Sequence, residues 1–215
     1  MHNKTKMTAL TALFILGLIL VPNARAQWYA GGNIGGVRSQ FGDSTIAGDL
    51  GAMGVTATGS ASETAAAGKV FLGYQFGSSI AVEGGYFYLG NFLRISGTAT
   101  APVAANFNGS DQGQGLDIDI VGKLAMGKGF SGLGRVGAAY FRSDATAASS
   151  APGNNGPNSG TNNRGILEAG LGLQYDFTQT VAGRVEWLRY FGAPNGLTSN
   201  NINIDFYSAG VAVKF

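Results

Sequence analysis

Apolar residues recur at every second position in short segments along most of the chain. In the segment 69–76, KVFLGYQF, the even-numbered residues are all apolar, and the odd-numbered ones include Lys69, Gly73 and Gln75. A period of two is that of a β-strand whose faces meet different surroundings. The same alternation predicts eight strands, at 28–38, 69–76, 80–90, 116–126, 133–142, 166–177, 181–190 and 202–215.

Short and long connections alternate between these segments. Gly, Ser and Thr mark three tight turns, at 77–79, 127–131 and 178–180, whereas four long connections span 39–68, 91–114, 143–165 and 191–201. The connection 143–165 is rich in Ala, Ser, Asn, Gly and Pro, which predicts a mobile loop. Tight turns at one end and long loops at the other are typical of an all-β fold, an antiparallel eight-stranded transmembrane up-and-down β-barrel.

The beginning of the chain follows another pattern. Two lysines precede the uncharged apolar run 8–21, and Ala24 and Ala26 frame a small-x-small cleavage site. This order predicts a secretory signal peptide over 1–26 and an outer-membrane barrel domain over 27–215. The alternative is a retained membrane anchor, for which the apolar run is short, because a helical span needs roughly 20 residues.

Removal of the signal peptide changes the charge of the chain. The signal holds three of the 14 basic residues and none of the 12 acidic ones, which leaves 11 bases against 12 acids. No basic face for nucleic acid follows from this balance. The chain has no Cys, and its only histidine, His2, lies in the signal. Ser-His-Asp and Cys-His nucleophiles and histidine metal sites are therefore excluded, and no cofactor is expected.

Aromatic residues gather towards the strand ends. Those near the tight turns are Trp28, Tyr74, Phe76, Tyr175, Phe177 and Phe215, and those towards the long connections are Tyr86, Tyr88, Phe92, Tyr140, Trp187 and Tyr207. Two aromatic belts suit the two interfaces of a membrane. The alternative is a soluble β-sandwich or lipocalin-like barrel, in which faces made largely of Gly and Ala would have to meet water.

The faces opposite the apolar ones fill the lumen if the apolar faces meet lipid. The expected lumen ionic network comprises Glu83, Lys123, Arg135, Glu168, Arg184 and Glu186, with Lys69, Asp117 and Asp119 on the same side. The interior of an eight-stranded barrel is just wide enough for side chains. This size favours a packed, salt-bridged plug, and a narrow water path through the same charges is the alternative.

Two local patterns have a chemical reading that the context disfavours. Asp117 and Asp119 share one strand face, but a glycosidase pair would need a sugar cleft that eight strands lack, so they are expected to line the lumen. Residues 132–137 spell G-x-G-x-x-G, which binds dinucleotides only between a strand and a helix. Here another strand follows, and the glycines are expected to make room inside the barrel.

Three segments resemble the OmpA-like eight-stranded outer-membrane barrels, which include small porin-like proteins. They are WYAGGNIGG from Trp28, GYQFGSSIAVEGGYFYLG over 73–90, and VAGRVEWLRY over 181–190. The resemblance implies a location in the outer membrane of a Gram-negative bacterium, with both termini in the periplasm. It also implies that Glu83 and Arg184 pair inside the barrel, with Lys123 and Glu168 as their neighbours.

The last residues, SAGVAVKF, fit the final-strand pattern of these barrels through Ser208, Gly210, Val213 and Phe215. The resemblance implies that the barrel assembly machinery reads this strand as an insertion signal, and that lipid and lipopolysaccharide surround the barrel. Full-length OmpA-type proteins add a peptidoglycan-binding domain. The sequence stops at the barrel, so cell-wall anchoring is not expected.

These patterns together favour a non-enzymatic barrel that supports outer-membrane integrity and presents four long extracellular loops for surface interactions. A narrow porin-like channel for ions or small solutes is the second hypothesis. An outer-membrane lipid-modifying enzyme is disfavoured, because acyl-modifying and proteolytic barrels usually need a histidine.

Overall fold

The computed structural model describes residues 27–40, 56–152, 157–197 and 201–215, so the predicted signal peptide lies outside the described residues. The described chain forms antiparallel strands joined by turns and short connections. Within these ranges no helix has the length and apolar character needed to cross a membrane. The strands are β1 (Gln27–Ser39), β2 (Thr56–Ser62), β3 (Thr64–Phe76), β4 (Ile80–Tyr88), β5 (Leu93–Ala101), β6 (Ala105–Gly127), β7 (Phe130–Ser149), β8 (Asn158–Asp176), β9 (Val181–Ala193) and β10 (Ile202–Lys214).

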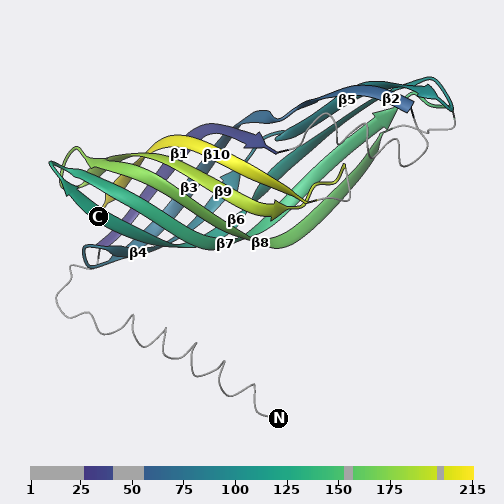
Figure 1. The fold of residues 1–215 in the computed structure, drawn as a ribbon. Coiled ribbons are helices and arrows are strands. Elements are labelled where there is room, and N and C mark those ends of the chain that lie inside the picture. Colours follow the sequence, from purple (N-terminus) through teal and green to yellow (C-terminus); the bar gives the residue numbers. More distant parts are fainter. Residues whose placement is uncertain (1–26, 41–55, 153–156, 198–200) are drawn as a thin grey trace, which may run out of the picture.

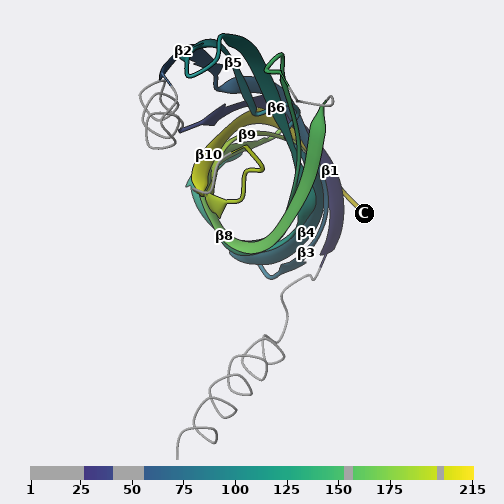
Figure 2. The same cartoon turned by 90° about the vertical axis from the view of Figure 1, so that its right-hand side faces the viewer.

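Eight of these strands close into a ring (Figures 1 and 2). The order around the ring is β1, β3, β4, β6, β7, β8, β9 and β10, so each strand lies beside its neighbours in the predicted sequence order. The first and last strands pair along almost their whole length, from Tyr29 opposite Lys214 to Ser39 opposite Ile204. The eight ring strands are those that the alternation of apolar residues predicts.

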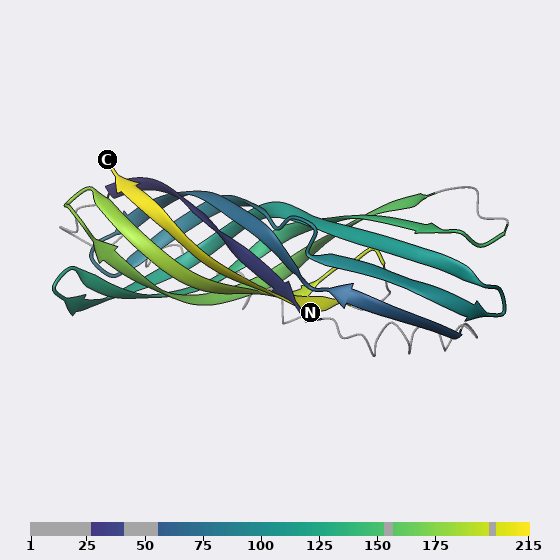
Figure 3. The same ribbon diagram turned by 90° about the horizontal axis from the view of Figure 1, so that it is seen from above.

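The other two strands, β2 and β5, extend the sheet beyond the ring. β5 pairs with β6, and β2 pairs with β5. The outer parts of β6 and β7 continue their pairing as far as Phe107 opposite Ser149, and β8 pairs with β7 from Asn158 onward. We call β2, β5 and the outer parts of β6, β7 and β8 the outer sheet; in Figure 3 its teal and green strands project past the ring, away from the C-terminus.

The outer sheet overturns part of the loop prediction. The segments 39–68, 91–114 and 143–165 contain strands β2 and β5 and the outer parts of β6, β7 and β8. The mobile loop predicted over 143–165 is therefore wrong where β7 and β8 run through it. The strands of the outer sheet carry Ser, Thr, Asn and Gly on their exposed face in place of apolar residues. The hydrophobic alternation therefore fades there while the backbone pairing continues.

The wall of the ring is apolar outside, and the side chains that alternate with these apolar residues on β6 include buried carboxylates. On β6 the outward side chains of Leu116, Ile118 and Leu124 are 60% to 72% exposed. Asp117 and Asp119, which alternate with them, are 7% and 1% exposed. An apolar exterior of this kind is the reverse of a soluble fold and matches a surface that lies in hydrocarbon.

Two apolar layers fill the interior near the ends of the ring. The inner layer, at the tight-turn end, comprises Tyr29, Phe71, Ala81, Val121, Leu133 and Ala212. The aromatic layer, towards the outer sheet, is larger and includes Phe87, Phe92, Phe141, Leu188, Tyr190 and Phe206. Among these, Phe87 and Tyr190 have ring centroids 4.8 Å apart. Little interior volume is left for water between such side chains.

Phe92 was predicted in the aromatic belt near the long connections, and this prediction is wrong for that residue. Its side chain is fully buried in the aromatic layer, edge to face with Phe141 at a centroid distance of 6.0 Å. The chain turns inward at Gly90, whose φ of +58° is a conformation that glycine adopts without steric cost. The Oγ of Ser39 donates a hydrogen bond to the carbonyl of Phe92 at 2.9 Å, which fixes the inward position.

Candidate functional site

Charged side chains fill the ring between the inner layer and the aromatic layer. This ionic layer is built from six strands, β3, β4 and β6 to β9, and all its members are buried. Strand pleating directs them inward, because each alternates with apolar residues that face outward. The members are Lys69, Glu83, Asp117, Asp119, Arg135, Glu168, Arg184 and Glu186.

Glu83 accepts hydrogen bonds from three side chains around it. Its Oε1 accepts hydrogen bonds from Arg184 Nη1 at 2.6 Å and from the Tyr29 hydroxyl at 2.7 Å. Its Oε2 accepts from Arg135 Nη2 at 2.7 Å. The structure therefore brings together Glu83 and Arg184, the pair that the family resemblance implies.

Arg135 joins three acidic residues from three other strands. Its Nη2 lies 2.7 Å from Glu83 and 2.8 Å from Glu186, and its Nη1 lies 3.1 Å from Asp119. Glu186 also accepts a hydrogen bond from the side-chain amide of Asn33. A planar guanidinium can serve several carboxylates at once, which an ammonium group does less well.

Glu168 and Lys123 occupy different parts of the interior. Glu168 lies in the ionic layer, 3.9 Å from the ammonium of Lys69. Lys123 lies nearer the tight turns, where its ammonium is 3.3 Å from Asp176. The resemblance implies that both are neighbours of the Glu83–Arg184 pair: Glu168 lies in the same layer as that pair, and Lys123 lines the same cavity as Arg184.

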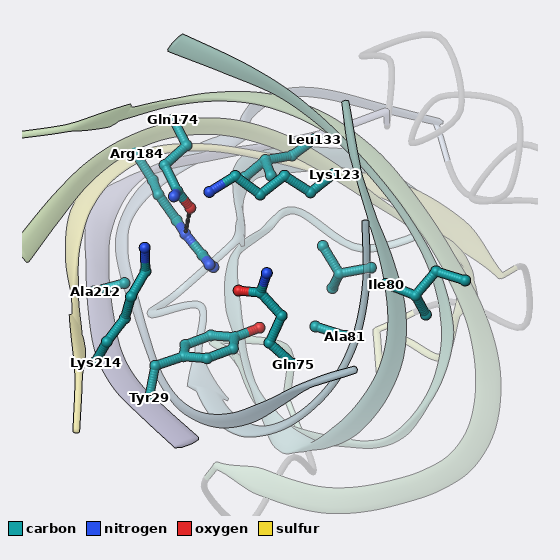
Figure 4. A pocket seen from close by; sticks show the side chains of 11 residues that line it. Tyr29, Gln75, Ile80, Ala81, Lys123, Leu133, Gln174, Arg184, Ala212 and Lys214 are labelled. Atoms are coloured by element: carbon teal, nitrogen blue, oxygen red, sulfur yellow. Dashed lines mark hydrogen bonds between the residues drawn. The ribbon is translucent and has the colours of Figure 1, made fainter. Parts of the chain in front are cut away.

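A short chain of contacts connects the ionic layer with the tight-turn end of the lumen. Arg184 Nε donates to Gln174 Oε1 at 2.9 Å, and Gln174 Nε2 donates to Asp176 at 2.6 Å. Beside these groups is a cavity of about 20 Å³, lined in part by Lys123 and Lys214 (Figure 4). A cavity of this volume has room for about one water molecule.

Four residues of this network were not predicted from the sequence. Tyr29, Asn33 and Gln174 are neutral, so a search for charges misses them, although each lies on the inward face of its strand. Asp176 ends β8 beside the tight turn, where alternation gives little information. The signal that could have found Tyr29 and Asn33 is their period-two spacing in the segment WYAGGNIGG.

The two remaining sequence motifs form neither a dinucleotide site nor a glycosidase site. The G-x-G-x-x-G residues 132–137 lie within strand β7, without the strand-to-helix turn that a dinucleotide site needs. Asp117 and Asp119 both contact the ammonium of Lys69, at 2.8 and 3.1 Å, so they line the lumen with a cation between them. This arrangement offers no space for a sugar ring.

The predicted insertion signal lies on β10 and just after it. Val213 and Phe215 are 46% and 70% exposed on the outward face, and Ser208 and Gly210 alternate with that face. The amide of Phe215 donates to the carbonyl of Trp28 at 3.0 Å, so the last residue contacts the first described strand. Recognition of this strand by the assembly machinery stays a prediction.

Comparison with known proteins agrees with this architecture. A family model described as "OmpA-like transmembrane domain" matches residues 23–215. The chain belongs to this family. The OmpA-like resemblance and the predicted fold class, an antiparallel eight-stranded outer-membrane barrel, are thereby confirmed.

Solved structures show the same fold as this OmpA-like chain. Neisserial surface protein A is 14% identical, with 87% of this chain and 97% of that chain covered and a TM-score of 0.50. The outer membrane protein OprG from Pseudomonas aeruginosa is 12% identical, with 90% and 97% covered and a TM-score of 0.50. No curated protein matches the sequence significantly. The apolar exterior of the ring is therefore its lipid-facing surface.

We expect Arg135→Ala to destabilise this OmpA-like chain by about 3–5 kcal/mol, because three buried carboxylates lose a partner. Arg135→Lys keeps the charge without the guanidinium fork, so its loss should be smaller. Urea unfolding in detergent or vesicles, followed by tryptophan fluorescence, measures both changes.

Arg142→Ala is the matched control for this prediction. Arg142 pairs with Asp144 at 2.9 Å on the exposed outer sheet and lowers the pKa of that carboxyl, but water solvates both groups. An exposed pair contributes little to stability. Equal losses in the Arg135 and Arg142 variants would contradict the importance of the ionic layer.

Proposed function

We propose that this chain is a non-enzymatic structural barrel of the outer membrane that seals its own lumen and presents the outer sheet for surface contacts. The observation that carries the proposal is the filled interior. An apolar layer, the ionic layer and a second apolar layer follow one another along the ring. An ion that crossed the ring would have to break buried ion pairs and displace aromatic side chains.

The proposal assigns the outer sheet to the cell exterior and the tight turns and both chain ends to the periplasm. Support comes from the change in polarity of the outward-facing residues along β6. Its outward residues are apolar from Leu116 to Met126, whereas Asn106, Asn108 and Gln112 continue the same face beyond the ring. A boundary of this kind is expected where a strand leaves hydrocarbon for water and lipopolysaccharide.

The outer sheet supports the surface role through its regular polar face. Cross-strand register places Ser62 opposite Arg94, Arg94 opposite Ser110, and Ser110 opposite Thr146, with Ser159 next in the row. Hydroxyl groups at neighbouring positions can bind polar molecules through hydrogen bonds. Strands of this sheet run through parts of three of the four long loops of the sequence hypothesis, 39–68, 91–114 and 143–165.

An enzymatic function has little support. Residues 27–215 contain no histidine or cysteine, and the charged groups of the lumen are engaged with one another or buried. Nucleophilic catalysis needs a nucleophile and an accessible base within hydrogen-bond reach. Lipid hydrolysis by the purified protein would overturn this part of the proposal.

Planar-bilayer recording separates the sealed barrel from the narrow channel. We expect the purified protein to give no steady openings, because the ionic layer and both apolar layers fill the lumen. The Glu83→Ala and Arg184→Ala variants weaken the ionic layer but keep the aromatic layer, so they should also stay closed. Steady, ion-selective openings of the unaltered protein that vanish in these variants would establish the channel instead.

Single-cysteine labelling on intact cells tests the proposed orientation. The chain has no cysteine of its own, so each introduced residue gives an unambiguous signal. Ser96→Cys on the outer sheet should react with a membrane-impermeant maleimide, and Ser78→Cys in a tight turn should react only after the outer membrane is opened. Labelling of Ser78→Cys alone on intact cells would invert the proposed orientation.

A further inference from the structure

The ionic layer has more acidic than basic residues. It combines the five carboxyl groups of Glu83, Asp117, Asp119, Glu168 and Glu186 with only three cations, Lys69, Arg135 and Arg184. All eight side chains are buried between apolar layers, where an uncompensated charge is costly. The layer therefore has fewer positive charges than its five carboxylates would need for neutrality.

The shortage is concentrated on one side of the layer. Glu83 and Glu186 each have at least two partners that donate hydrogen bonds. Arg135 contacts both, Arg184 contacts Glu83, and Asn33 donates to Glu186. Asp117, Asp119 and Glu168 instead share the ammonium of Lys69, and only Asp119 receives a further contact, from Arg135. Each of these three residues offers a carboxylate oxygen within 4.8 Å of the other two.

Several oxygens of this cluster have no hydrogen-bond partner among the described residues. They are both oxygens of Asp117, Oδ1 of Asp119 and both oxygens of Glu168, although Oδ2 of Asp117 and Oε1 of Glu168 lie 2.8 and 3.9 Å from the Lys69 ammonium. Lys69 approaches the Oδ2 atoms of the two aspartates, so their Oδ1 atoms are free for another ligand. A carboxylate without donors is expensive to bury.

Tyr190 is a second, independent polar group without a hydrogen-bond partner beside this cluster. Its side chain is fully buried, its hydroxyl has no partner among the described residues, and it lies directly opposite Glu168 on the neighbouring strand. Buried tyrosine hydroxyls usually have a partner. A neutral oxygen and a carboxylate that both lack a hydrogen-bond partner among the described residues thus lie beside each other in the interior.

Two glycines leave room for the carboxylates. Gly137 lies between Asp119 and Glu168 in the cross-strand register, and a Cβ there would collide with the Asp119 carboxylate. A Cβ at Gly85 would lie 2.7 Å from Oδ1 of Asp117. Without side chains at these two positions, the three acidic groups can converge.

We propose that Asp117, Asp119 and Glu168, assisted by the Tyr190 hydroxyl, bind one hard divalent metal cation inside the ring, in addition to Lys69. Carboxylate and hydroxyl oxygens are ligands of Ca²⁺, which tolerates irregular geometry better than Mg²⁺ does. One divalent ion supplies the two positive charges that the ionic layer lacks. Because the cluster is buried, the ion enters while the strands assemble and then stabilises the closed ring.

Calcium analysis of the refolded protein tests this site. The chain is refolded in detergent with CaCl₂ after chelator treatment, dialysed, and measured by inductively coupled plasma mass spectrometry. We expect about one Ca²⁺ per chain, and a higher unfolding temperature than for protein refolded in chelator. Protein refolded in calcium that carries no ion and has the same unfolding temperature would overturn the proposal.

Two variants and a control make the test specific. Glu168→Gln keeps the side-chain shape and removes one charge, so we expect at least a tenfold weaker calcium affinity in protein that still folds. Tyr190→Phe removes one neutral ligand and should weaken binding severalfold. Asp144→Asn removes a half-buried acid of the outer sheet and should leave calcium binding unchanged.

A proton is the competing source of positive charge. If Glu168 holds a proton and no metal, the protein binds no calcium, and Glu168→Gln matches the unaltered protein in stability at neutral pH with or without chelator. That result, or calcium binding to Glu168→Gln as tight as to the unaltered protein, rejects the metal site. Loss of binding in Asp144→Asn would also reject it, since the ion would then lie on the outer sheet.

Discussion

Backbone hydrogen bonding in lipid is the constraint on which this structure depends. Hydrocarbon offers no partner for an N–H or C=O group, so strands can cross it only when the sheet has no free edge. The pairing of β1 with β10 removes that edge, and the hydrogen bond between Phe215 and Trp28 extends the pairing to the tight-turn end. Beyond the ring this constraint no longer applies, and the sheet there is open, with β2 at one edge.

Closure with eight strands makes the interior narrow, and narrowness determines its chemistry. Side chains must fill the space, and charges placed there must pair, because apolar layers on both sides keep water away. Arg135 illustrates the consequence, since one guanidinium serves carboxylates from three other strands. The ionic layer ties opposite walls together, but each partner is costly to remove and the acidic excess still needs compensation.

The strands of the ring were predictable because lipid enforces a strong contrast between the two faces. Where one face meets hydrocarbon, as at Leu116 and Ile118, every second residue is apolar and the alternation is clear. The outer sheet has polar residues such as Ser96 and Asn108 on its exposed face, so it carries no such signal although its backbone pairing is equally regular. The inward turn at Gly90 that buries Phe92 likewise has no period to reveal it.

Alternation also gives the face of a residue but not its height in the ring. Lys123 and Glu168 were both correctly placed inside, yet Lys123 lies opposite Leu133, which in turn lies opposite Gly172. Lys123 is thus four positions from Glu168 in the register, and it contacts Asp176, whereas Glu168 lies beside Lys69. Cross-strand register and the tilt of the strands together decide which charges meet, and no single segment contains that information.

The central claim is that one face of β6 lies in lipid along the ring and in water along the outer sheet. Nitroxide spin labels on single cysteines from Asn106 to Met126, in protein reconstituted into vesicles, measure this directly through collisions with oxygen and with a water-soluble nickel complex. We expect oxygen contact at the even positions from 116 to 126, little contact with either reagent at Asp117 and Asp119, and nickel contact at 106 and 108. Nickel contact at Ile118 and Ile120 would contradict the membrane-spanning ring.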